Sequence, residues 1–188
     1  MRRNSGLSPI FAPFLAGFAA IGATAGPLAP WDPYPEGYTC CNLHYDRDWI
    51  SDANWSTFPM IPAGARIKVT SYGSNRASVE IDGKNFRIGQ DYGRGDESLE
   101  NFIGKLIVKE NPRDRIAAYP EKVREAIRLG KVIPGMSRDQ ALIAAGHPPT
   151  HQTKILDAPV WSYWNDRFSR WTVTWDGNGI VREVAGQR

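Results

Sequence analysis

The stretch PGMSRDQALIAAGHPP, residues 134–149, limits what this chain can fold into more than any other segment. Ser137 and Gln140 have the S-x-x-Q spacing of a capping box, in which each side chain bonds the backbone N–H of the other residue. This spacing predicts a helix that begins at Arg138. The apolar residues that follow at helical spacing predict its buried side.

The residues at the two ends of this helix have strong conformational preferences. Gly146 permits the left-handed backbone of a helix end, and Pro148 prevents the helix from continuing. Gly135 and Met136 set the loop that leads into the helix, where a flexible methionine can fill an irregular gap beneath a sheet. These residues specify an architecture, and they do not point to a catalytic site.

Segments on both sides of this helix also have clear helix and strand patterns, so the whole C-terminal third can be assigned from the sequence. Residues 120–130, PEKVREAIRLG, predict a preceding helix with proline at its start and glycine at its end. Two turn signals, Asn165-Asp166 and the DGNG of residues 176–179, separate three apolar and aromatic runs that we expect to be strands. The expected order is helix, helix, strand, strand, strand.

The N-terminal half shows the alternating pattern of short, half-buried strands. Asp82-Gly83 is a strong hairpin signal between two such runs. With an earlier strand from Tyr38, the alternating runs predict a small antiparallel sheet or barrel, similar to an SH3-like bacterial module. The runs cover residues 66–70, 77–81 and 84–89.

Residues 98–108, SLENFIGKLIV, lie between the two parts and have a mixed character. Ser98 can cap a short helix, and the later residues suit a strand. Gly104 is the expected point of change.

The first 25 residues resemble a secretory signal peptide. Arg2 and Arg3 form a positive n-region, an uncharged apolar stretch follows, and Ala23-Thr24-Ala25 is a small-x-small cleavage pattern. The alternative is a retained membrane anchor, but two prolines interrupt a run that is already short for a bilayer span. We expect cleavage before Gly26 and export to the periplasm or cell envelope. We expect no lipid anchor, because no cysteine follows the apolar region.

The composition of the mature chain disfavours several classes of function. Cleavage would remove two of the 23 basic residues and none of the 20 acidic ones, which leaves a nearly neutral chain without a basic cluster. Nucleic acid is therefore not an expected partner. Four prolines within residues 26–36 predict an extended lead-in. Without a recognisable catalytic constellation, we expect no enzyme activity, no cofactor, no bound metal and no small-molecule substrate.

Cys40 and Cys41, in the stretch GYTCCNLHYD, are the two cysteines of the chain, and four interpretations compete for them. They can be small strand residues, a disulfide with each other or with another chain, a Cys-Cys-x-x-His metal clip with His44, or a thiol nucleophile with His44 as its base. Export favours a disulfide. Adjacent residues of an extended strand point to opposite faces, however, which strains a bridge between them. The sequence leaves these interpretations open.

The C-terminal third resembles the BamE/SmpA/OmlA family. IPGMSRDQALIAAGHPP resembles the G-M-[ST]-x-x-[EQ] signature with its closing G-x-P, and VWSYW and VTWDGNGIV are similar to the tryptophan-bearing strand and the final hairpin that follow it. The match covers about residues 118–184. The resemblance implies a two-layer α-α-β-β-β BamE-like domain over residues 116–188. Together with the SH3-like β module that the alternating runs predict over residues 26–115, this gives an expected α+β fold.

The resemblance also implies a function. BamE is a non-enzymatic accessory lipoprotein of the machinery that folds outer-membrane β-barrels, so we expect a protein-binding or assembly-factor module with an envelope protein as its partner. Association with the outer membrane or with peptidoglycan fits the same expectation. Two alternatives remain, which are a cell-wall-binding module that acts through the SH3-like segment and a cysteine-dependent enzyme.

Aromatic residues of the last strands are the candidate partner-binding side chains. Four of the seven tryptophans lie in the last 28 residues. Trp161 and Trp164 fall on opposite faces of a regular strand, so we expect one of them to face solvent or the N-terminal module. Core packing is the competing interpretation for each ring. The candidates are Trp161, Tyr163, Trp164, Trp171 and Trp175.

Overall fold

The computed structural model describes residues 35–188, so the expected signal peptide and most of the proline-rich lead-in lie outside the described residues. These residues form eleven strands and four short helices. In chain order they are β1 (Glu36–Thr39), β2 (Leu43–His44), β3 (Trp49–Ser51), β4 (Met60–Ile61), β5 (Arg66–Tyr72), β6 (Arg76–Ile81), β7 (Lys84–Gly89), α1 (Leu99–Leu106), β8 (Ile107–Val108), α2 (Pro112–Ala117), α3 (Glu121–Arg128), α4 (Arg138–Ala145), β9 (Val160–Trp164), β10 (Arg170–Trp175) and β11 (Val181–Ala185).

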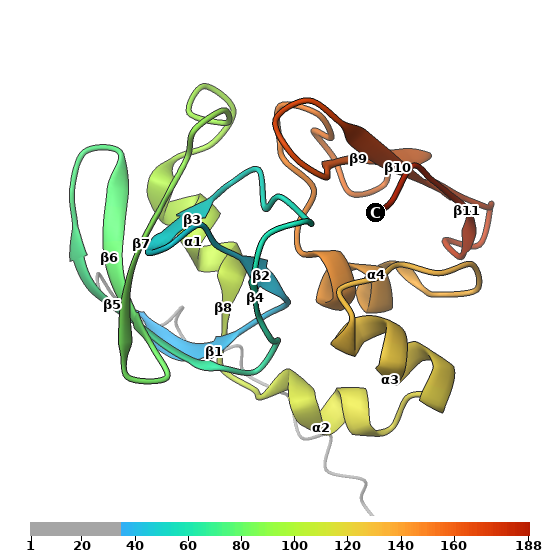
Figure 1. Cartoon of the computed structure of the whole chain (residues 1–188), viewed down its shortest axis with the longest axis horizontal. Helices are drawn as coiled ribbons and strands as arrows, with labels where there is room; N and C mark the ends of the chain where they lie inside the picture. Colours follow the sequence, from blue (N-terminus) through green and yellow to red (C-terminus); the bar gives the residue numbers. More distant parts are fainter. Residues whose placement is uncertain (1–34) are drawn as a thin grey trace, which may run out of the picture. The chain divides into compact units, whose positions relative to one another are not determined.

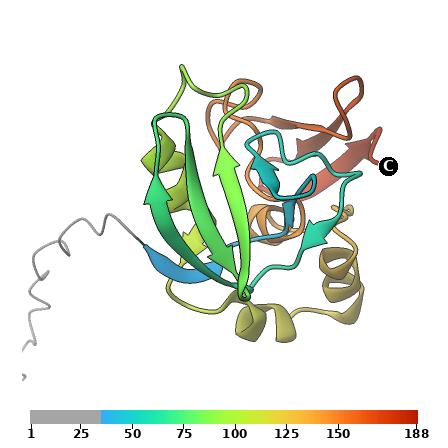
Figure 2. The same ribbon diagram turned by 60° about the vertical axis from the view of Figure 1, so that its left-hand side comes forward.

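The first half of the described chain forms a six-stranded mixed sheet with the order β3-β7-β6-β5-β1-β8 (Figures 1 and 2). β5, β6 and β7 form an antiparallel meander, and Asp82-Gly83 makes the tight turn between the last two with positive φ at both positions. This confirms the predicted hairpin. Alternate residues of the three strands enter a first hydrophobic core, which Phe102 and Ile103 of α1 complete.

α1 confirms its predicted cap but not its predicted end. The hydroxyl oxygen of Ser98 accepts a hydrogen bond from the N–H of Asn101. The helix then continues through Gly104, and the change to strand comes at Ile107. Four apolar side chains of α1 are buried, and this burial outweighs the modest helix-breaking tendency of one glycine.

α3, α4 and the three-stranded sheet β11-β10-β9 share a second hydrophobic core. α4 begins at Arg138 as predicted, and Ser137 and Gln140 form both bonds of the capping box. Met136 is fully buried in this core. The order of elements from α3 onward is therefore the one that the sequence predicts.

The predicted fold class is nevertheless wrong. The described chain is mostly β, with a curled six-stranded mixed sheet and four short helices, and it is not an SH3-like module followed by a two-layer α-α-β-β-β domain. β3 makes the first sheet mixed, because it pairs in parallel with β7. The C-terminal elements also depend on the N-terminal half, since Ala63 is part of the second core. Residues 35–188 all belong to one compact unit.

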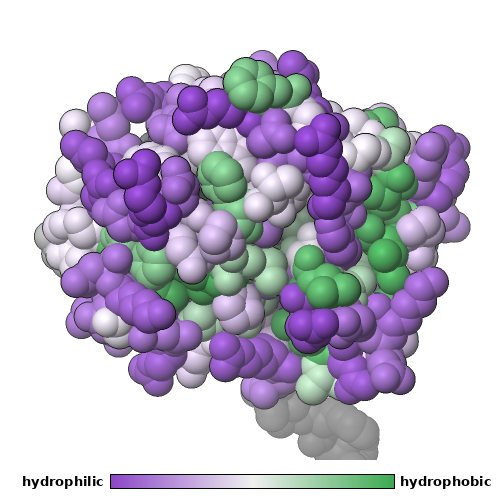
Figure 3. All heavy atoms as spheres, viewed as in Figure 1, coloured by the Kyte–Doolittle hydropathy of each residue, from purple (hydrophilic) through white to green (hydrophobic). Residues whose placement is uncertain are grey.

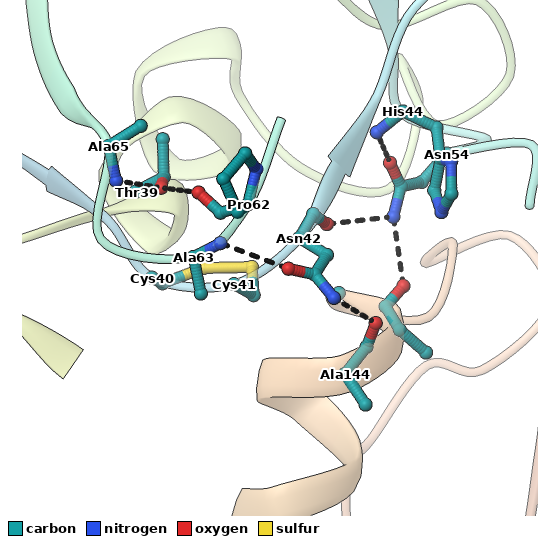
Figure 4. The surroundings of a disulfide bond; sticks show 12 residues. Thr39, Cys40, Cys41, Asn42, His44, Asn54, Pro62, Ala63, Ala65 and Ala144 are labelled. Carbon is teal, nitrogen blue, oxygen red and sulfur yellow. Dashed lines mark hydrogen bonds between the residues drawn. A yellow bond between two sulfur atoms is a disulfide. The ribbon is translucent and has the colours of Figure 1, made fainter. Parts of the chain in front are cut away.

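The end of α4 shows most clearly how the two halves join (Figure 4). A helix leaves its last carbonyl groups without intrahelical partners. Here the backbone N–H of Asn42 donates to Ile143, its side-chain amide donates to Ala144, and the amide of Asn54 donates to Ala145, at 3.0, 2.9 and 2.8 Å. Two asparagines of the N-terminal half therefore cap three successive carbonyls of a C-terminal helix.

Gly146 makes this contact possible. Its φ is +79°, in the region that glycine tolerates, and a Cβ atom at this position would lie 2.6 Å from the amide nitrogen of Asn54. The glycine that the sequence predicts as a helix stop thus also gives room to the capping side chain.

No helix within residues 35–188 has the length and apolar character that a bilayer crossing requires.

Candidate binding surface

A buried carboxylate, that of Asp52, positions the loop that follows β7. Its two oxygens accept hydrogen bonds from the backbone N–H groups of Asp91, Tyr92 and Gly93, at 2.8, 3.2 and 2.6 Å. Gln90 holds the same loop from the other side through bonds to carbonyl groups within it. Charge-assisted bonds from backbone donors stabilise a buried carboxylate without a cationic side chain. The loop therefore holds the ring of Tyr92 in a defined place.

Tyr92 lies beside two rings of the C-terminal half, those of His151 and Trp164. The ring centroids are 5.4 Å apart for Tyr92 and His151, and 6.4 Å apart for each of the other two pairs. The three ring planes lie within 22–31° of one another. Tyr92 is 47% exposed, and the other two residues are partly exposed. The three residues thus form a nearly parallel aromatic group, and Tyr92 is its most exposed member.

Strand alternation explains why Trp164 is available at this surface. Trp161 and Tyr163 point into the second core, and Trp164 lies on the opposite face of β9. Arg170 is its antiparallel partner on β10, and the guanidinium carbon lies 4.6 Å from the centroid of the indole ring. A cation at this distance is attracted to the face of the ring. Arg170 also donates to the side-chain oxygen of Gln152, which fixes its position.

Two further aromatic rings, those of Trp55 and Phe58, extend this group. Trp55 is nearly buried, and it meets Phe58 and Tyr92 edge-on at centroid distances of 5.3 and 6.4 Å. We call Trp55, Phe58, Tyr92, His151 and Trp164 the aromatic cluster. The first three come from loops of the N-terminal half, and the last two come from the C-terminal half. The cluster therefore exists only while the halves are joined.

Several nitrogen atoms of the cluster have no hydrogen-bond partner. Among residues 35–188, six covered side-chain nitrogens lack one, and four of them belong to Trp55, His151 and Trp164. Covered polar groups without partners are rare in folded proteins. Ring-to-ring packing, rather than hydrogen bonding, therefore holds His151 and both indoles in place.

Four of the five aromatic residues that the sequence singles out are core residues. Tyr163 stacks on Trp171, and Trp161 meets Trp175 edge-on, each pair at 4.4 Å between centroids. All four side chains are 0–5% exposed, so Trp164 is the one candidate that a partner can touch. Burial raises the pKa of the Tyr163 hydroxyl well above its usual value. This hydroxyl donates to the carbonyl of Gly146.

The sequence gives no signal for the rest of the cluster. Trp55, Phe58, Tyr92 and His151 lie in loops, where no periodic pattern indicates which way a side chain points. A cue exists only in their residue type, because aromatic residues in polar loops are unusual enough to be examined as binding residues. Figure 3 shows a face that is mostly hydrophilic, with hydrophobic groups as separate patches between charged side chains.

Cys40 and Cys41 are joined by a disulfide, and no free thiol remains in the described part of the chain (Figure 4). His44 is buried beside them in sequence, but its Nδ1 pairs with the carbonyl of Phe58 at 2.8 Å. Burial lowers the pKa of this imidazole. Chemistry at a thiolate would therefore need the disulfide to be reduced first.

Within residues 35–188, no three histidine, cysteine, aspartate or glutamate side chains come together in a way that could hold a metal ion. Comparison with known proteins finds no matching family model, no matching curated protein and no matching solved structure. The likeness to the BamE/SmpA/OmlA family therefore rests on the residues of the C-terminal third alone.

Proposed function

We propose that this chain is an exported, non-enzymatic protein-binding module of the cell envelope, and that it contacts its partner through the aromatic cluster. The observation that carries the proposal is the group of three nearly parallel rings that belong to the partly exposed residues Tyr92, His151 and Trp164. Aromatic side chains are enriched among the residues that contribute most to protein–protein binding energy.

The way in which the cluster is held also supports binding. Asp52 fixes the loop of Tyr92, and Arg170 lies over Trp164 on a paired strand. Side chains that are already ordered lose little conformational entropy when a partner covers them. The cluster thus offers aromatic area at a low ordering cost.

Two further observations support the cellular location and the class of function. A disulfide between adjacent cysteines is consistent with an oxidising compartment, where such bonds persist. The motifs of the C-terminal third resemble those of an envelope assembly factor that acts by protein contact. Both are consistent with the signal peptide that we expect from the sequence.

A photoreactive phenylalanine analogue tests the proposal in living cells. We expect the analogue at position 92 to crosslink one envelope protein on illumination. The matched control is the analogue at Tyr38, a partly exposed tyrosine on the six-stranded sheet that also lies under an arginine, Arg66. Crosslinking from both positions alike, or from neither, would contradict a binding role for the cluster.

Affinity measurements with the purified partner then test the energetics. Tyr92→Ala and Trp164→Ala should each weaken binding by about tenfold or more, which corresponds to at least ~1.4 kcal/mol. Tyr38→Ala should leave affinity unchanged. The same variants are assayed for co-sedimentation with purified peptidoglycan. Binding to peptidoglycan that Trp164→Ala abolishes would favour the cell-wall-binding alternative over a protein partner.

A further inference from the structure

The Cys40–Cys41 disulfide lies where the chain passes from one sheet to another. β1 belongs to the six-stranded sheet, and β2 belongs to a separate two-stranded sheet with β4. The crossing takes place in residues 40–42, which are not part of either strand. Side chains at consecutive strand positions point to opposite faces, so a bridge between neighbours requires the chain to leave the strand conformation. The disulfide and the bend therefore depend on each other.

Buried polar residues on both sides of the bend form hydrogen bonds with segments that are distant in sequence. The hydroxyl of Thr39 donates to the carbonyl of Pro62 and accepts from the N–H of Ala65, both at 3.1 Å. On the other side, the side-chain oxygen of Asn42 accepts from the N–H of Ala63 at 2.9 Å, while its amide caps α4. The bend sets the position of Asn42 relative to Thr39.

We infer that the Cys40–Cys41 disulfide is a redox-sensitive switch, in which reduction releases the bend and loosens the hold of Asn42 on the end of α4. The meander of β5, β6 and β7 keeps its fold in the reduced state, because it does not include the bend. The inference goes beyond the proposed function and needs no knowledge of the partner. The switch also bears on the proposed binding function, because the aromatic cluster is assembled from both halves of the chain.

Thiol–disulfide exchange with an external dithiol opens the switch. One thiolate of the dithiol attacks the sulfur of Cys40, the more exposed of the two residues, and the sulfur of Cys41 leaves as a thiolate that takes a proton. The second thiol of the reagent attacks the mixed disulfide and releases Cys40 as a thiol. Two electrons pass to the protein, and the reagent becomes a cyclic disulfide.

Amide hydrogen exchange, followed by NMR with and without dithiothreitol, tests this inference on the wild-type chain. Two backbone amides report on the contact between the N-terminal half and α4, which we call the joint. The N–H of Asn42 donates to Ile143, and the N–H of Ala63 donates to the side chain of Asn42. We expect both to exchange at least about tenfold faster after reduction, and to return to the original rate after reoxidation. Val79, in the centre of the first sheet, is the internal reference and should not change.

The double variant Cys40→Ser with Cys41→Ser is the matched control for effects of the reagent. It should show fast exchange at Asn42 and Ala63 from the start and should not respond to dithiothreitol. Thiol alkylation with mass spectrometry verifies that the wild-type disulfide opens. Three results overturn the inference, namely a disulfide that native conditions keep closed, reduction without faster exchange at the joint, and equal acceleration at Val79, which would mean global unfolding.

Discussion

Replacing Asn42 by alanine tests whether the joint between the halves stabilises the fold. The Asn42 side chain makes three buried hydrogen bonds, to the carbonyls of Ile127 (2.7 Å) and Ala144 (2.9 Å) and from the N–H of Ala63 (2.9 Å). Ile127 keeps a second partner, the N–H of Gly130. The variant therefore leaves one carbonyl and one N–H buried without their bond.

The expected loss follows from these two groups. A buried polar group that loses its partner costs about 1–3 kcal/mol, so the two groups together should lower the free energy of unfolding of Asn42→Ala by about 2–6 kcal/mol. A domain of this size has about 5–15 kcal/mol in total. Because a urea m-value is about 1–3 kcal/mol/M, the midpoint should fall by about 2 M.

Urea unfolding measured by tryptophan fluorescence and by far-UV circular dichroism gives this quantity. Asn75→Ala, at an exposed position in the β5–β6 turn, is the matched control and should stay within about 0.5 kcal/mol of wild type. Asn42→Asp keeps the acceptor for Ala63, but it places a carboxylate oxygen against the carbonyl groups of Ile127 and Ala144. Because a buried carboxylate without donors is costly, this variant should be at least as destabilised as the alanine variant. A loss below about 1 kcal/mol in Asn42→Ala would refute the view that the capping bonds contribute to stability.

Two further predictions concern pH and the isolated C-terminal segment. Burial and, to a lesser extent, the nearby Lys105 lower the pKa of His147 to about 4, below the usual value of 6.5. The unfolded chain then binds a proton that the folded chain rejects, so stability should fall by about 1–2 kcal/mol between pH 7 and pH 5. Urea titrations at both pH values measure this loss, and a His147→Gln variant that loses as much would point to other groups. The sequence predicts that residues 116–188 fold alone, but without Asn42, Asn54 and Ala63 we expect such a fragment to melt at a lower temperature than the full chain. Calorimetry of both decides this, and equal melting temperatures would show that the halves are independent.

Local signals in the sequence predict local structure well. The capping box of Ser137 and Gln140, the Asp82-Gly83 turn and the alternation that separates Trp161 from Trp164 depend on residues within a few positions of one another. Each of these features can be inferred without knowledge of the rest of the fold. They give the elements correctly from α3 to β11.

Features that depend on distant contacts could not be inferred in this way. β3 has three residues and pairs with a strand almost 40 positions later, so its short run shows no period. Asn42 and Asn54 resemble ordinary loop residues, because the carbonyls that they cap lie far along the chain. The aromatic cluster could not be inferred from the sequence for the same reason, since Tyr92 and His151 meet only after both loops are placed. The error in fold class comes from such contacts, because the pairing of β3 with β7 is what makes the six-stranded sheet mixed.

The capping of α4 by Asn42 and Asn54 also has a consequence for the order of folding. The side-chain bonds from these residues to Ile127, Ala144 and Ala145 span 85, 102 and 91 positions. Contacts of such long range form late, because the intervening chain must first be brought into place. Because the chain is synthesised from its N-terminus, the two side-chain amides are made well before the carbonyl groups that they will bind. We therefore expect the six-stranded sheet to form first. The docking of α4, which buries the helix carbonyls and the two asparagine amides, should be the slow step.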